Sequence, residues 1–252
     1  MRRRCGALVL ALAAVTAAAD DRRSGFDFMT RETQALQRDD GLNPAMLWVR
    51  GGEIAWSEKA GRADKACADC HGDAARSMRG VAARYPAFDA ASSQPLTLAG
   101  RINACRVRHQ RAGPHPPESE PLLSLAAFVG MASRGLPIAP PDDARLAPWR
   151  AQGQRLFTQR IGQLDLSCAQ CHDVGAGRRL GGSTIPQAHP TGYPIYRLEW
   201  QGLGSLQRRL RGCFAGVRAE VPPFEHADLV ALELHLMQRA AGLPLETPAV
   251  RP

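Results

Sequence analysis

Aromatic residues are scarce in this 252-residue chain, in which phenylalanine, tryptophan and tyrosine together make up 6%. A core built from protein side chains alone would therefore depend on leucine, alanine and valine, and a large bound apolar group could supply the missing volume. After the first nineteen residues, no apolar run approaches the roughly 20 residues of a membrane-spanning helix. The sequence thus predicts a soluble chain without a lasting membrane anchor.

Acidic residues are also in deficit, since 24 Asp and Glu stand against 32 Lys and Arg and leave a formal net charge of +8. A nucleic-acid-binding protein gathers its cations into a patch or stripe, whereas the basic residues here are scattered. We therefore expect no nucleic acid as a partner. Attraction to acidic partners or small anions fits the composition better.

The first nineteen residues, MRRRCGALVLALAAVTAAA, have the pattern of a secretory signal. Arg2 to Arg4 form the positive end, Gly6 to Thr16 the apolar stretch, and Ala17 to Ala19 the small-residue cleavage site. Removal of this segment would take Cys5 away and lower the formal charge to +5. The pattern predicts a periplasmic mature protein.

Two copies of the motif Cys-x-x-Cys-His, CADCH and CAQCH, contain four of the six remaining cysteines. In c-type haem attachment, two such thiols form thioethers with the haem vinyl groups and the following histidine binds the iron. A four-cysteine zinc site or two local disulfides would use the same thiols, but neither explains a histidine after each pair. The sequence therefore predicts two covalently bound haem c groups. The attachment residues would be Cys67, Cys70, Cys168 and Cys171, and the iron ligands His71 and His172.

The chain repeats itself with a period of about one hundred residues. The segment at 117–137 is echoed at 224–244, and both show helical apolar spacing before a Gly-Leu-Pro stop. We predict an all-α fold of two tandem cytochrome c-type haem domains related by internal duplication. The expected parts are a signal peptide at 1–19, an N-terminal domain at 20–136, a linker at 137–149 and a C-terminal domain at 150–252.

Each iron needs a second axial ligand or an open position. Cys105 and Cys213 are 108 positions apart and are each other's counterparts in the two repeats. They could form one disulfide or stay inert, but ligation of each haem by its own cysteine preserves the equivalence of the repeats. A thiolate stabilises ferric iron, so both potentials should be low. Other candidates have no such counterpart or lie where core packing explains them. These are Met78, Met131, His109, His115, His189, His226, His235 and Met237.

The chain resembles the A subunit of the SoxAX cytochromes of bacterial thiosulfate oxidation. The resemblance covers nearly the whole mature chain and is carried by the two haem motifs and the distal cysteine of each half. Its most specific part is Arg209-Leu210-Arg211-Gly212-Cys213, followed by FAGVRAE.

This resemblance implies an L-cysteine S-thiosulfotransferase that joins thiosulfate oxidatively to a cysteine of a SoxYZ-like carrier protein and passes two electrons to haem. It implies a heterodimer with a smaller SoxX-like monohaem cytochrome. Cys213 would be both a ligand of the second iron and the catalytic residue, and its sulfur would bear an extra sulfur atom as a persulfide. Arg209 would bind substrate. The first haem, held by His71 and Cys105, would be structural or a remote electron site.

The local chemistry agrees, because guanidinium groups stay charged and offer forked donors to sulfonate oxygens. If the segment is helical, Arg209 shares a face with Cys213. Arg101 has the same spacing before Cys105, so spacing alone does not define a substrate site. For the other nearby cations, a surface position and a docking role remain equally open. These are Arg208, Arg211 and Arg218.

Three other functions use similar parts. A thiosulfate dehydrogenase couples two thiosulfates to tetrathionate and also has two c haems with a cysteine ligand. A plain dihaem electron carrier would have Met or His at the distal positions and no arginine cluster. A dihaem peroxidase would need an open or displaceable position on one iron.

Overall fold

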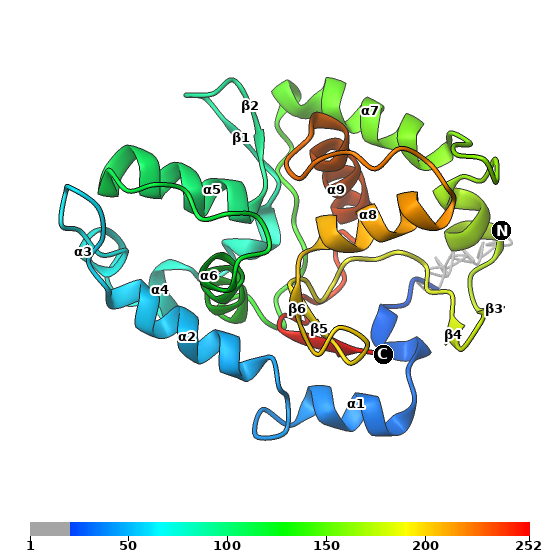
Figure 1. Ribbon diagram of the computed structural model, residues 1–252, viewed down its shortest axis with the longest axis horizontal. Coiled ribbons are helices and arrows are strands. Elements are labelled where there is room, and N and C mark those ends of the chain that lie inside the picture. The colour runs from blue at the N-terminus through cyan, green and yellow to red at the C-terminus, as the bar shows by residue number, and fades with distance from the viewer. Residues whose placement is uncertain (1–20) are drawn as a thin grey trace, which may run out of the picture.

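The computed structural model describes residues 21–252. The predicted signal peptide and Cys5 lie outside the described residues. Figure 1 shows two lobes, with α2 to α6 on one side and α7 to α9 on the other. Strands β5 and β6 lie between the lobes, near the C-terminus.

The helices and strands follow in chain order. The helices are α1 (Arg31–Arg38), α2 (Met46–Ser57), α3 (Ala68–His71), α4 (Ala74–Ser77), α5 (Leu98–Cys105), α6 (Glu120–Met131), α7 (Ala147–Thr158), α8 (Leu206–Gly216) and α9 (Ala227–Arg239). The strands are β1 (Ala87–Asp89), β2 (Gln94–Leu96), β3 (Arg179–Leu180), β4 (Ser183–Thr184), β5 (Ile195–Arg197), β6 (Gly202–Gly204) and β7 (Ala249–Arg251).

Helices dominate the architecture, but the prediction of an all-α fold was too strict. Strands β1 and β2 form an antiparallel pair, as do β3 and β4. Strand β5 pairs with β6 antiparallel and with β7 parallel. In each half a Tyr-Pro pair directly precedes a strand, Tyr85-Pro86 before β1 and Tyr193-Pro194 before β5. Proline blocks a helix and keeps the residue before it extended, so the middle of each half pairs as short strands.

The two closing helices form where the apolar periodicity predicts them, as α6 and α9. Each stops before a glycine in the left-handed region, Gly135 with φ of 80° and Gly242 with φ of 88°. Glycine adopts this conformation without the Cβ penalty, so the Gly-Leu-Pro signals end the helices as expected.

Each closing helix crosses an earlier helix at backbone contact distance. Helix α6 packs on α2 at Gly52, and α9 packs on α7 at Gly153. A Cβ on Gly52 would collide with the carbonyl oxygen of Ser124, and one on Gly153 with that of Ala231. Both lobes therefore depend on a glycine at the crossing point.

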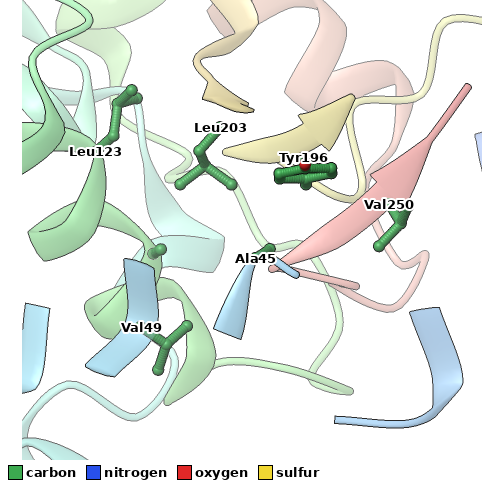
Figure 2. Close-up of a cluster of buried hydrophobic side chains, with 7 residues drawn as sticks. Ala45, Val49, Leu123, Tyr196, Leu203 and Val250 are labelled. Atoms are coloured by element: carbon green, nitrogen blue, oxygen red, sulfur yellow. The ribbon is translucent and has the colours of Figure 1, made fainter. Parts of the chain in front are cut away.

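A shared hydrophobic core joins the lobes (Figure 2). The first half contributes Ala45, Val49, Leu123 and Ala127, and the second contributes Tyr196, Leu203 and Val250. Burial of a large apolar side chain stabilises by roughly 1.5–3 kcal/mol, so this cluster holds the halves together.

Each lobe contributes one glutamate that hydrogen-bonds a helix N-cap residue of the other lobe. The backbone N–H of Ser205, the N-cap of α8, donates to Glu118 Oε2 at 3.3 Å. The hydroxyl of Thr97, the N-cap of α5, donates to Glu225 Oε1 at 3.3 Å. A carboxylate near a helix N-terminus is favourable, so each half stabilises the cysteine-bearing helix of the other.

The segment expected as a linker, 137–149, is packed against the second half. Ile138 is 1% exposed and lies among Met237, Ala240 and Leu245. Its backbone N–H donates to the Leu243 carbonyl at 2.9 Å. The start of α7 at Ala147 falls inside the same segment. This connection is thus held in place by the second half.

Replacing Gly153 by alanine should lower the free energy of unfolding by about 1–3 kcal/mol, because the added methyl group forces α7 away from α9. Urea unfolding followed by circular dichroism measures the change. Gly212→Ala is the matched control, since a Cβ there meets open space. Equal stability of the Gly153 and Gly212 variants would contradict the close crossing.

The buried carboxyl group of Glu233 should also make the free energy of unfolding decrease as the pH rises. This side chain lies on α9 and lines a cavity of about 100 Å³ between the halves, together with Glu225 and Gln207. Burial, followed by the charge of Glu225, raises the pKa of Glu233 from 4.5 to about 8. The folded state then binds a proton that the unfolded state has lost, so stability decreases as pH rises from about 4.5 to about 8.

Glu233→Gln should flatten this pH dependence, as measured by denaturant unfolding at pH 5, 6.5 and 8. Glu53→Gln, a change at an exposed acid on α2, should keep the slope of the parent protein. An unchanged slope in the Glu233 variant would show that this carboxyl group does not cause it.

Candidate haem and anion sites

The first Cys-x-x-Cys-His motif opens on a cavity of about 540 Å³. Cys67 caps α3, which contains Cys70 and ends at His71. Cys105, the last residue of α5, lines the same cavity. Cofactor pockets have volumes of about 300–1,000 Å³, so this cavity has the size and the ligand set for a haem.

The walls of the first cavity suit a flat apolar group. Trp56 donates its indole N–H to the Gly72 carbonyl at 3.0 Å, and its ring centroid lies 5.7 Å from that of His71. Met78 and Val129 pack with Trp56 in one apolar cluster. Cationic side chains also line the cavity and suit carboxylate groups such as haem propionates. They are Lys65, Arg84 and Arg106.

The second motif places its histidine on a single π-helical turn, Gln170–Val174. His172 Nδ1 lies 2.7 Å from the Pro186 carbonyl oxygen. A carbonyl only accepts, so Nδ1 carries the proton and Nε2 is left as the ligand atom, as is usual for metal-bound histidine. Burial lowers the pKa of His172, which favours the neutral imidazole that binds metal.

His172 and Cys213 line one cavity of about 270 Å³ in the second half. Arg209 and Cys213 both lie on α8 and both line this cavity, as the four-residue spacing predicts. Tyr193 and Arg197 line it as well. Burial raises the pKa of Tyr193 to about 12, so its hydroxyl stays protonated at neutral pH.

The arginines at equal spacing before the two cysteines have different partners. Arg101 forms an ion pair with Asp89 at 2.9 Å, and Arg108 pairs with the same carboxylate at 2.7 Å. Hydrogen bonds from Arg108 and Ser92 hold the pKa of Asp89 well below its usual range. Arg209, by contrast, makes no side-chain ion pair or hydrogen bond with any residue in the range 21–252. Of these two arginines, only Arg209 is left without a partner in the described chain.

The other candidates for iron ligation fall into two groups. Met78 and His109 line the first cavity, and His189 lines the second. The rest line neither haem cavity. Of these, Met131 and Met237 pack in hydrophobic clusters, His226 caps α9, and His235 packs on Phe157. The backbone N–H of His115 donates to Asn103 Oδ1 at 2.8 Å.

Three observations bear on the alternative uses of the thiols, a four-cysteine zinc site and disulfide bonds. All six cysteines of the described chain are free. Within the same residues, no group of three or more His, Cys, Asp and Glu side chains is placed to hold a bare metal ion. Cys105 and Cys213 line separate cavities.

Sequence reasoning assigned no role to Arg197, although the structure brings it to the second cavity. Its side chain is 12% exposed, and its buried Nε has no hydrogen-bond partner in the described part of the chain. The one available signal was its position 108 residues after Asp89, the same offset that relates the two distal cysteines.

These features define a c-type cytochrome: a Cys-x-x-Cys-His turn faces a cysteine across a cavity with apolar walls. In agreement, residues 51–138 match the family described as SoxA/TsdA, cytochrome c domain. The protein therefore carries covalently bound haem c. No helix within residues 21–252 combines the length and apolarity needed to cross a bilayer.

The chain belongs to the SoxA family of L-cysteine S-thiosulfotransferase subunits. It is 37% identical to the SoxA subunit of Pseudaminobacter salicylatoxidans, over 92% of this chain and 82% of the relative. Identity to the SoxA subunit of Rhodovulum sulfidophilum is 34%, over 92% and 81%. The crystal structure of SoxXA from P. pantotrophus superposes with a TM-score of 0.88 at 32% identity, covering 92% of this chain and 87% of that one.

Proposed function

We propose that this subunit holds two haem c groups, one in each half, and that the halves are duplicated domains at 20–136 and 150–252 joined by 137–149. Equivalent residues at constant offsets support this proposal. Gly61 and Gly162 both have positive φ and both lie against the backbone just after a cysteine-bearing helix. Asp64 and Asp165 also match in conformation, with φ of 48° and 49°.

The first haem would be attached to Cys67 and Cys70, with His71 and Cys105 as its iron-binding residues. The second would be attached to Cys168 and Cys171, with His172 and Cys213 as its iron-binding residues. When bound, haem supplies a one-electron acceptor, and a thiolate ligand keeps its potential low.

The reaction joins the outer sulfur of thiosulfate to a cysteine sulfur of a carrier protein. One sulfur–sulfur bond forms, the thiol proton leaves, and two electrons pass to haem. Cys213, carried as a persulfide, provides the sulfur at which substrate reacts. The guanidinium of Arg209 binds and orients the sulfonate oxygens of thiosulfate.

One observation carries this assignment: Arg209 and Cys213 face one cavity from one helix, and this cation has no counter-ion in the described chain. A charged group that lines a cavity and is left without an anion favours an anionic ligand. The corresponding Arg101 already pairs with Asp89, so in the described chain the arginine four residues before the distal cysteine lacks a counter-ion only in the second half.

One proposed partner follows from a solved relative, and the other from the family resemblance. A SoxX-like monohaem cytochrome would complete a heterodimer, as the name of the SoxXA structure indicates for that protein. A SoxYZ-like carrier would deliver the acceptor cysteine. Export by the signal at 1–19 would place the protein in the periplasm, where haem is attached to reduced thiols.

Cys213→Ala should abolish thiosulfate-dependent haem reduction in the presence of the carrier, because the sulfur at the reacting position is lost. Intact mass should still show two covalent haems. Species heavier by one sulfur atom should occur in the parent protein and vanish in the variant. Retained turnover would refute the role of Cys213, and tetrathionate as the main product would instead favour a thiosulfate dehydrogenase.

Arg209→Lys should raise KM for thiosulfate about tenfold or more, because lysine keeps the charge but loses the forked donor. Steady-state haem reduction measures the change. Arg208→Lys is the matched control, since Arg208 lies next to it on α8 but stacks on Trp200 at 4.1 Å. Equal KM values for the two variants would exclude Arg209 as the anion-binding residue.

A further inference from the structure

Asp89 and Arg197 occupy the same place in the two halves. Asp89 ends β1 and pairs with Gln94, whereas Arg197 ends β5 and pairs with Gly202. The register of the two hairpins is identical at an offset of 108 residues, from Ala87 and Leu96 through the last pair. The structural position is thus conserved between the halves while the charge is inverted.

The same offset relates the helices that follow these hairpins. Arg101 and Cys105 on α5 correspond to Arg209 and Cys213 on α8. The third charged residue of the first half, Arg108, corresponds to Gly216. Hence the two arginines of the first half share a carboxylate, whereas Arg209 has a second arginine in the place of that carboxylate.

In the first half, the residue at this strand position, Asp89, is the counter-ion of two arginines. Asp89 is 4% exposed and binds Arg101 and Arg108 at 2.9 and 2.7 Å. A buried carboxylate with two guanidinium partners and a hydrogen bond from Ser92 has its acceptor sites filled. Arg101 is therefore not available to an external anion.

In the second half, contacts within the protein fix the Arg197 side chain, but no buried carboxylate neutralises its charge. Its guanidinium lies 5.1 Å from the Trp200 ring centroid, a contact that leaves the formal charge in place. Its ion-pair partner Glu199 is 64% exposed, and surface pairs of this kind contribute little. The pKa of Arg197 is lowered, first by burial and then by the positive charge of Arg209, so the two cations repel each other across the cavity.

We propose that Arg197 and Arg209 together form a two-armed site for a small doubly charged oxyanion, and that the exchange of aspartate for arginine at this strand position determines which cavity binds substrate. The proposal deepens the proposed function and rests on Cys213 being the reacting residue. Two guanidinium groups that line one cavity match a dianion such as thiosulfate in charge, and each offers a forked donor to its oxygens. A single charge would leave one arginine uncompensated, so the site selects dianions over monoanions.

The test uses the assembled holoprotein with its cytochrome partner and thiosulfate as the probe. Arg197→Gln should raise KM for thiosulfate about 10- to 100-fold, the range for loss of one charge-assisted contact, and Arg197→Lys should lose less. Arg197→Asp should be the most impaired, because the new carboxylate binds Arg209 as Asp89 binds Arg101. Arg218→Gln, at an exposed cation beyond the end of α8, is the control and should keep the parent KM.

Equilibrium binding separates affinity from turnover. Calorimetric titration of thiosulfate into Cys213→Ala should show a dissociation constant at least tenfold lower than in Cys213→Ala/Arg197→Gln. Sulfate should compete with thiosulfate far better than chloride at equal ionic strength, and this preference should disappear in the double variant. Unchanged haem spectra and unfolding midpoints establish that the loss is one of binding.

The outcomes distinguish the two levels of proposal. If the parent protein fails to turn over thiosulfate with carrier while both haems are present, the proposed function is wrong. If the parent turns over but Arg197→Gln and Arg197→Lys keep its KM and affinity, Arg197 does not bind the anion. An Arg197→Asp variant no worse than Arg197→Gln would overturn the role of charge inversion in choosing the cavity.

Discussion

The close crossing of helices at Gly52 and Gly153 is the constraint on which the rest of the structure depends. Each glycine lets a closing helix approach the backbone of the helix that leads into a haem motif. A side chain there would separate the two helices, and with them the walls of the haem cavity. Packing at backbone distance leaves little freedom for the apolar groups behind it, so the crossing sets the shape of each lobe before any cofactor is considered.

The two lobes then behave as one body because they share a core and brace each other. The cluster around Tyr196 and Leu203 includes residues from both halves. Glu118 and Glu225 each reach the first turn of the cysteine-bearing helix in the opposite half. The position of Cys213 is thus supported by a residue outside its own domain, which links the geometry of the reacting site to the packing of the whole chain.

The two cavities differ in a few charges, and the proposed difference in their functions rests on these charges. Both have a Cys-x-x-Cys-His turn, a distal cysteine and an arginine four residues before it. In the first half Asp89 occupies that arginine, which suits a cavity that only holds a cofactor. In the second, Arg209 has no such partner and Arg197 stands where the aspartate would be. The proposed duplication, with locally altered charge, would explain how one chain can combine an electron site with an anion-binding site.

The sequence by itself determined the haem motifs, the closing helices and the correspondence of Cys105 in the first half to Cys213 in the second. Each of these depends on local spacing or on repeats that can be read along the chain. It misjudged the extended segments after Tyr85 and Tyr193, since strands of three residues carry too little periodic signal. The spacing alone also did not separate Arg101 from Arg209, and only the family resemblance favoured Arg209. Only the tertiary structure decided the physical difference between the two arginines, because charge neutralisation depends on which side chains meet in space, and Asp89 lies twelve residues from the arginine that it binds.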